Sequence, residues 1–205
     1  MKLIGLTGNI ASGKSTVAQW LVKQGAAHLD ADHLVHEMYE AGTEVTAEIA
    51  ARFGEQVLAP DGSVNRKALG PIVFNDQEAL RALEKIVHPR IGPATAERIR
   101  AAAMQAEPPP AMVLEAVKLI ESGRHKIVDQ VWFVIADPAI QKERMMQYRG
   151  HSVAEADARL QAQPAIDARL PFVHVIIKNN GTMEELIEQV QAAWQALLKN
   201  KKKEA

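Results

Sequence analysis

The sequence predicts an α/β fold in which a five-stranded parallel sheet is flanked by helices. Five short apolar runs, each as long as a buried strand, alternate with segments whose apolar residues have helical spacing. A glycine-containing loop of the phosphate-binding type follows the first run. Two further helical stretches, Thr43–Gln105 and Met145–Pro171, interrupt the alternation and predict small helical regions added to the sheet.

The N-terminal part alternates strand, loop and helix. The apolar run Lys2–Thr7 predicts a buried strand, and Lys14–Gln24 predicts the helix after the loop, with Gly25 at its C-terminal cap. The other strands are expected at Ala27–Asp30, Ala111–Leu114, Val131–Ala136 and Val173–Ile177.

The remaining helices are predicted from apolar residues three and four positions apart. Thr43 and Asp137 are candidate caps, and Trp20, Trp132 and Trp194 are expected to pack in or near the core. In chain order the helices are Ala31–Glu40, Glu44–Phe53, Arg66–Phe74, Gln77–Val87, Arg90–Gln105, Ile140–Gln147, Val153–Gln163 and Met183–Leu198. The end, Lys199–Ala205, is expected to be a solvated tail.

Composition excludes several classes of protein. The 205 residues are 47% hydrophobic and 24% charged, which is typical of a globular domain, and the lack of cysteine excludes a disulfide framework. No apolar run approaches the ~20 residues of a membrane span, and no signal-peptide pattern is present, so we expect a cytoplasmic protein without a membrane partner. Without the lysine-rich tail the chain has 20 basic and 24 acidic residues, a balance of −4 that argues against nucleic acid as a partner.

The segment Gly8-Asn-Ile-Ala-Ser-Gly-Lys14-Ser15 matches the phosphate-loop pattern G-x-x-x-x-G-K-[ST] in full. Glycines let the backbone approach an anion, and successive N–H groups point at it from the start of a helix. Lys14 is expected to reach the β- and γ-phosphates of ATP, and the Ser15 hydroxyl to help hold Mg²⁺. The alternative is a glycine-rich turn with a solvated lysine.

Carboxylates follow two of the predicted strands. Asp30 and Asp32 end the second strand, where ligands bind in open α/β sheets, and either one can orient an attacking hydroxyl or only cap the next helix. Glu115 follows the third strand and either holds Mg²⁺ through water or is a structural carboxylate.

Motifs along nearly the whole chain resemble the dephospho-CoA kinase family. They are the phosphate loop within Thr7–Thr16, Asp30-Ala-Asp32, Arg66–Leu69, Val73-Phe74, His88-Pro89 with Ile91, Leu119–Glu121, Arg144, Arg159 with Gln163, and Asn179 with Gly181. The resemblance implies a P-loop kinase core with a helical acceptor-binding region and a lid. It also implies transfer of the γ-phosphate of ATP to the ribose 3′-hydroxyl of dephospho-coenzyme A, the last step of coenzyme A biosynthesis.

The resemblance also implies residue roles. Asp32, Lys14 and Arg144 would be catalytic, with Asp32 activating the acceptor and Arg144 near the transferring phosphoryl group. ATP would be bound by Gly8, Asn9, Ala11, Ser12, Gly13, Lys14, Ser15, Thr16 and Asn179. Dephospho-coenzyme A would be bound by Asp32, His88, Arg66 and Leu119. Ser15 would hold Mg²⁺, with Glu115 as the candidate that acts through water.

The expected organisation is a single kinase domain. Its core covers about residues 1–42, 111–143 and 172–198, the helical acceptor-binding region about 43–107 and the lid about 144–171. The tail covers residues 199–205, and we expect a monomer.

The sequence departs from the family pattern mainly around the acceptor and the lid. Asn9 and Ala11 stand where the family has glycine, and Ala11 would be strained if its φ is positive. The other departures are His36, Val117, Lys118, Tyr148 and Val173-His174. Two alternatives stay open: another small-molecule P-loop kinase, or a non-catalytic ATP-binding module, against which Asp32 argues.

Overall fold

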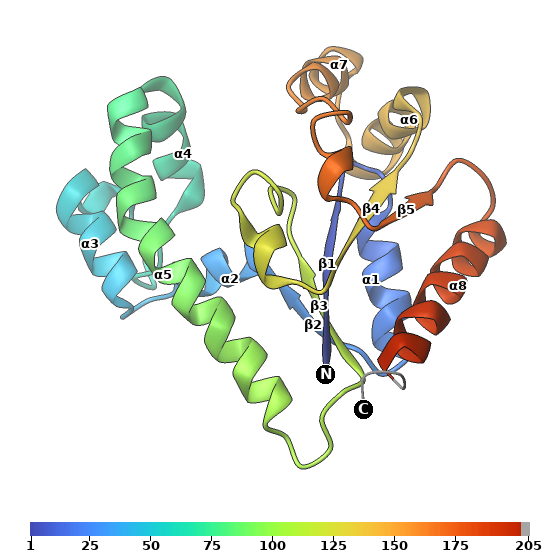
Figure 1. Cartoon of the computed structure of the whole chain (residues 1–205). Helices are drawn as coiled ribbons and strands as arrows, with labels where there is room; N and C mark the ends of the chain where they lie inside the picture. The colour runs from blue at the N-terminus through green and yellow to red at the C-terminus, as the bar shows by residue number, and fades with distance from the viewer. Residues whose placement is uncertain (202–205) are drawn as a thin grey trace. The chain divides into compact units, whose positions relative to one another are not determined.

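The computed structural model describes residues 1–201, which form two compact units (Figure 1). We call Met1–Leu29 together with the chain from Ala102 onward the core unit, and Asp30–Ala101 the helical unit. None of the helices within residues 1–201 has the length and apolar character needed to cross a membrane.

The core unit is built on a five-stranded sheet with the order β2-β3-β1-β4-β5. Its strands are β1 (Lys2–Gly8), β2 (Ala27–Asp30), β3 (Ala111–Glu115), β4 (Gln130–Ile135) and β5 (Val175–Lys178). β1 pairs in parallel with β3 and β4, and β4 pairs in parallel with β5, which confirms the predicted α/β sheet. The register places Glu115 opposite Leu6, so the last residue of β3 lies beside the start of the phosphate loop.

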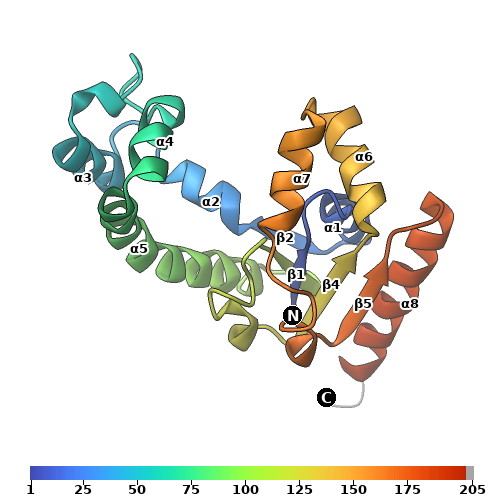
Figure 2. The ribbon, with the colours of Figure 1, turned by 90° about the horizontal axis from the view of Figure 1, so that it is seen from above.

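Helices α1 and α8 pack on one face of this sheet (Figure 1). Ile4 and Leu6 of β1 alternate toward that face and join Leu21, Trp132 and Trp194 in a buried cluster. The helices of the core unit are α1 (Lys14–Lys23), α6 (Pro138–Arg149), α7 (Val153–Gln161) and α8 (Met183–Lys201), with 3₁₀ turns η2 (Arg124–Ile127) and η3 (Leu170–Phe172). α6 and α7 lie side by side (Figure 2).

The helical unit has a separate apolar core. It contains α2 (Ala31–Glu37), α3 (Glu44–Phe53), η1 (Glu55–Val57), α4 (Arg66–Asn75) and most of α5 (Gln77–Ala103). Ile49, Val57 and Val73 are among the buried residues of this core. Thr43 caps α3 as predicted, because its hydroxyl accepts a hydrogen bond from the Thr46 N–H at 3.1 Å.

The two helices predicted at Gln77–Val87 and Arg90–Gln105 form one continuous helix, α5 (Figure 2). Pro89 and Pro93 lie inside it and lack the N–H that an interior helical position normally donates. The predicted break was wrong because tertiary packing outweighs this loss: Val87 and Ile91, on either side of Pro89, are buried in the core of the helical unit.

Some predicted element ends also differ. α2 ends at Glu37 rather than Glu40, and α7 ends at Gln161 rather than Gln163. The Asp137 side chain accepts no capping hydrogen bond from α6 and instead accepts one from Asn180 Nδ2 at 2.8 Å. Most of the predicted tail, residues 202–205, lies outside the described residues.

We expect Trp194→Ala to lower the free energy of unfolding by about 3–5 kcal/mol, because it leaves a cavity between α8 and the sheet. Trp194 is 3% exposed and belongs to the main buried cluster. Chemical denaturation followed by circular dichroism measures the change, and Gln195→Ala at the exposed neighbouring position is the control. A loss no larger than that of the control would show that α8 is not anchored through Trp194.

Candidate functional site

The phosphate loop joins β1 to α1 and has the tight backbone that its glycines predict. Gly13 has a φ of 94°, a left-handed conformation that favours glycine, and a Cβ at this position would overlap the Asn179 side chain. A Cβ at Gly8 would lie 2.5 Å from the Val134 carbonyl oxygen of β4. Both glycines are therefore required by close approaches as well as by the turn.

Ala11 has the positive φ that the sequence analysis identified as the condition for strain. Its φ is 54°, and it is the one non-glycine residue with a positive φ among the described residues. A left-handed conformation costs an alanine roughly 1–2 kcal/mol. Contacts from elsewhere in the core unit must therefore hold the loop in this shape.

Two side chains brace the second half of the loop from its carbonyl side. Asn179 Nδ2 donates to the Ser12 carbonyl at 2.8 Å, and Asn179 is 7% exposed. The Arg144 guanidinium lies 3.4 Å from the Ala11 carbonyl oxygen and donates to both Asn179 oxygens, at 3.1 and 3.2 Å. The structure thus places both residues against the loop, and their contacts with ATP stay predictions.

A buried carboxylate organises the charged groups at the end of the loop. Lys14 Nζ lies 2.5 Å from Glu115 Oε1, and the Ser15 hydroxyl donates to the same oxygen at 3.3 Å. His28 Nε2 lies 2.9 Å from Glu115 Oε2. The Glu115 side chain is 5% exposed, so it is buried among these partners.

These contacts keep Glu115 ionised. Burial by itself raises the pKa of the carboxyl, but the hydrogen bond to His28 and the positive charge of Lys14 outweigh it and lower the pKa to about 2. Glu115 therefore carries its negative charge beside Lys14 at neutral pH.

The sequence analysis did not identify His28 as a site residue. One feature of the sequence pointed to it: His28 and Asp30 lie two positions apart on the predicted second strand and so share a side of it.

The residue types at this point suit a divalent cation of the Mg²⁺ kind. The Ser15 hydroxyl and a Glu115 carboxylate oxygen are hard oxygen donors 3.3 Å apart. No group of three or more His, Cys, Asp or Glu within residues 1–201 is arranged to hold a metal ion. Mg²⁺ commonly uses one or two protein oxygens with waters and substrate phosphates, so the donor set fits.

A hollow of about 390 Å³ opens on one side of the loop. It is lined by Asn9–Thr16, Val117, Arg144, Tyr148 and Arg149. Of the residues predicted to bind ATP, seven line it, whereas Gly8 and Asn179 do not. Tyr148 is 79% exposed at its edge.

A second hollow, of about 530 Å³, also borders the phosphate loop. It is lined by Gly8, Ile10 and residues of the region expected to be the lid. Arg169, which sequence reasoning missed, lines it and is 4% exposed. Its guanidinium donates to Glu121 Oε1 at 2.7 Å and to Asn9 Oδ1 at 3.0 Å. No motif surrounds Arg169 in the sequence, so only the fold reveals that it contacts the loop.

The helical unit carries the predicted acceptor residues Asp32 and Arg66. Asp30 caps α2 by accepting from the N–H groups of Asp32 and His33, at 2.8 and 3.1 Å. Asp32 follows in the first helical turn with an exposed side chain. The structure thus gives Asp30 a capping role and leaves the Asp32 carboxylate exposed to solvent.

His36 lies near these groups. Burial lowers its pKa, and the charges of Arg66 and His33 lower it further against the opposing effect of Asp30 and Asp32. Arg66 is therefore the permanent cation of this group.

The other two predicted acceptor residues are His88 of the helical unit and Leu119 of the core unit. His88 is exposed in the middle of α5, and its contact with dephospho-coenzyme A stays a prediction. Leu119 of the core unit is fully buried, and a Cβ at Gly5 would lie 2.6 Å from its Cδ2. The structure gives Leu119 a packing role against β1 rather than a surface that a substrate can touch.

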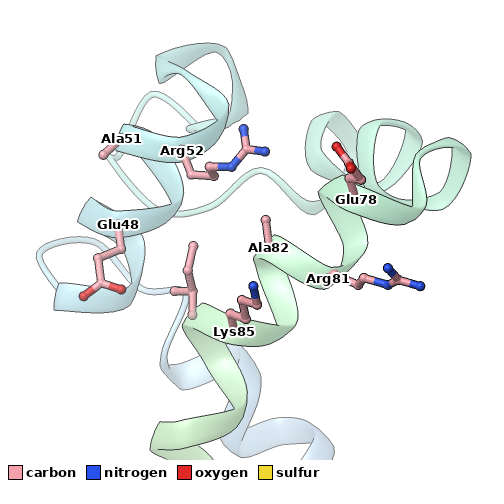
Figure 3. A pocket seen from close by; sticks show the side chains of 8 residues that line it. Glu48, Ala51, Arg52, Glu78, Arg81, Ala82 and Lys85 are labelled. Atoms are coloured by element: carbon pink, nitrogen blue, oxygen red, sulfur yellow. The ribbon is translucent and has the colours of Figure 1, made fainter.

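A hollow of about 730 Å³ lies between α3 and α5 in the helical unit (Figure 3). Arg52 extends from α3 toward it, whereas Glu48 and Arg81 point away (Figure 3). None of the predicted acceptor residues lines this hollow.

The chain is similar to a known protein family and to its members. The family model described as dephospho-CoA kinase matches residues 2–185. A dephospho-CoA kinase of Symbiobacterium thermophilum is 44% identical over 196 residues, which cover 96% of this chain and 81% of that protein. A dephospho-CoA kinase of Geobacter sulfurreducens is 43% identical over 194 residues, which cover 95% of this chain and 98% of that protein.

Solved structures are also similar to this chain. A Thermus thermophilus protein has a TM-score of 0.80 and 32% identity, with 96% of this chain and 97% of that chain covered. The dephospho-CoA kinase of Campylobacter jejuni has a TM-score of 0.75 and 26% identity, with 98% of this chain and all of that chain covered. With the family model matched over residues 2–185 and relatives at 43–44% identity, the chain belongs to the dephospho-CoA kinase family.

Proposed function

We propose that this chain transfers the γ-phosphate of ATP to the ribose 3′-hydroxyl of dephospho-coenzyme A, giving coenzyme A and ADP. The observation that carries the proposal is the set of Lys14, Ser15 and ionised Glu115 at a complete phosphate loop, in a member of this kinase family. The reaction is the last step of coenzyme A biosynthesis, and we place it in the cytoplasm with a monomeric enzyme.

In this proposal the loop binds the phosphates through backbone N–H groups and the start of α1. Lys14 exchanges its Glu115 partner for the β- and γ-phosphate oxygens, where it offsets the charge that develops during transfer. Ser15 and Glu115 would hold Mg²⁺, which neutralises charge on the phosphates when bound. Gly13 permits the tight backbone of the loop, and Arg144 and Asn179 support it from the carbonyl side.

The acceptor hydroxyl needs a group that orients it and removes its proton. We assign this role to Asp32, whose carboxylate is exposed, rather than to Asp30, whose carboxylate caps α2. As the oxygen–phosphorus bond to the acceptor forms, the bond from the γ-phosphorus to the leaving oxygen of ADP breaks and the hydroxyl proton passes to Asp32. Arg66 is a cation near Asp32 that suits an anionic acceptor.

Lys14→Ala should lower kcat by about 10²–10³-fold, because it removes a charge that acts where charge develops in the transition state. ADP release in a coupled assay with dephospho-coenzyme A measures the loss. Lys23→Ala, at an exposed position of the same helix, is the control and should retain full turnover. Near-native turnover of Lys14→Ala would show that the loop is not the ATP site.

Asp32→Asn should lose about 10²–10⁴-fold in kcat with unchanged ATP affinity, because it removes the proton acceptor and keeps the shape of the side chain. Asp30→Asn is the matched control, since asparagine also caps a helix well. Calorimetry with ATP and ADP release with dephospho-coenzyme A measure both effects. An inactive Asp30→Asn beside an active Asp32→Asn would reverse the assignment.

Acid should destabilise the wild type more than Glu115→Gln between about pH 4.5 and pH 2. The folded-state pKa of Glu115 is about 2, below its ordinary 4.5, so its ionised form stabilises the fold above pH 4.5 and this contribution disappears as pH falls toward 2. The full effect is on the order of 3 kcal/mol. Urea denaturation at pH 5 and pH 3 measures it, and equal pH slopes for both proteins would contradict the buried ion pair.

A further inference from the structure

The first half of the phosphate loop is connected to the end of β4 by a chain of side-chain hydrogen bonds. The Ile10 N–H donates to Gln163 Oε1 at 2.7 Å, and Gln163 Nε2 donates to Gln141 Oε1 at 3.3 Å. Gln141 Nε2 then donates to the Ala136 carbonyl at 2.5 Å. All these residues belong to the core unit, so the connection lies within one compact body.

The chemistry of the two ends fixes the direction of this chain. A backbone N–H only donates and a backbone carbonyl only accepts, so Gln163 must present its oxygen to Ile10 and Gln141 its nitrogen to Ala136. Gln141 is 2% exposed, and water therefore has little access to replace its partners. A glutamine at each position satisfies both ends at once, and an ionised glutamate at residue 163 satisfies only the Ile10 end.

The position of this contact in the loop gives it a consequence for ATP binding. Ile10 directly precedes Ala11, whose φ of 54° is unfavourable for alanine. Arg144 and Asn179 contact the carbonyl groups of Ala11 and Ser12, on the C-terminal side of the strained Ala11 conformation. Gln163 accepts from the N–H of Ile10, which precedes Ala11, so the loop is supported on both sides of Ala11.

We propose that Gln163 is a positioning residue for the phosphate loop, which it holds in its ATP-binding shape through Gln141 and the end of β4. The kinetic consequence rests on the proposed function. The effect on ATP binding does not require the acceptor and is measured without it.

The first test is ATP affinity of Gln163→Ala, measured by calorimetry in the presence of Mg²⁺. Loss of one hydrogen bond that holds the loop should weaken ATP binding by roughly 3- to 10-fold. The KM for ATP should rise by the same factor while kcat at saturating ATP and the melting temperature stay near wild-type values. Gln161→Ala, at an exposed position on α7, is the matched control and should bind ATP like the wild type.

We call the hydrogen-bonded series from Ile10 through Gln163 and Gln141 to Ala136 the relay. Gln163→Glu tests the direction of its hydrogen bonds. An ionised carboxylate accepts from Ile10 but cannot donate to Gln141, whereas the protonated acid does both. ATP affinity relative to wild type should therefore be reduced at pH 8 and recover as the pH falls through the ordinary pKa of a glutamic acid, about 4.3. Gln161→Glu should show no such pH dependence, and a pH-independent Gln163→Glu would overturn the relay.

Gln141→Met breaks the relay at a residue that does not touch the loop. It should weaken ATP binding, and the double variant with Gln163→Ala should be no weaker than Gln163→Ala alone, because the two residues act as one unit. Losses that add would overturn the relay. If Gln141→Met does not fold, the two Gln163 variants decide the question.

The outcomes separate this inference from the proposed function. A wild-type chain that binds ATP but releases no ADP with dephospho-coenzyme A refutes the proposed function, and the ATP affinities still test the relay. A wild-type chain that phosphorylates dephospho-coenzyme A, with Gln163→Ala binding ATP as tightly as Gln161→Ala, refutes the relay and leaves the function standing.

Discussion

The buried carboxylate of Glu115 is the constraint on which the candidate site depends. A carboxylate that is 5% exposed is costly unless it is paired, and here a lysine, a serine and a histidine surround it. These partners come from α1 and β2, on either side of the strand that carries Glu115. The sheet order β2-β3-β1 is therefore what makes the group possible, because it brings the end of β3 between His28 and the start of α1.

In the phosphate loop, contacts from residues distant in the sequence offset a local backbone strain. Ala11 adopts a conformation that its residue type resists, and four side chains from the segment 144–179 contact the loop: Arg144, Gln163, Arg169 and Asn179. Arg144, Gln163 and Asn179 contact the loop backbone, and Arg169 contacts the Asn9 side chain. The region expected to be the lid thus contributes to the shape of the loop as well as to its surroundings.

The helical unit differs from the core unit in how its candidate residues are held. Asp32 and Arg66 lie near helix starts, with exposed side chains and few partners, whereas Glu115 and Arg169 are buried and fully engaged. The pKa of His36 is lowered first by burial and then by the charge of Arg66, which favours the neutral imidazole.

The sequence by itself determined the sheet and the phosphate loop with Lys14 and Ser15, because strand periodicity and loop chemistry are local properties. It predicted strain at Ala11 only on the condition of a positive φ, which the structure supplies. Only the tertiary structure decided that α5 runs through two prolines, since packing of Val87 and Ile91 outweighs local preference. It also decided that His28, Gln141 and Arg169 support the site and that Leu119 is buried. His28 and Arg169 meet their partners across at least 48 positions of sequence, and Gln141 meets Gln163 across 22, so only the fold brings these pairs together.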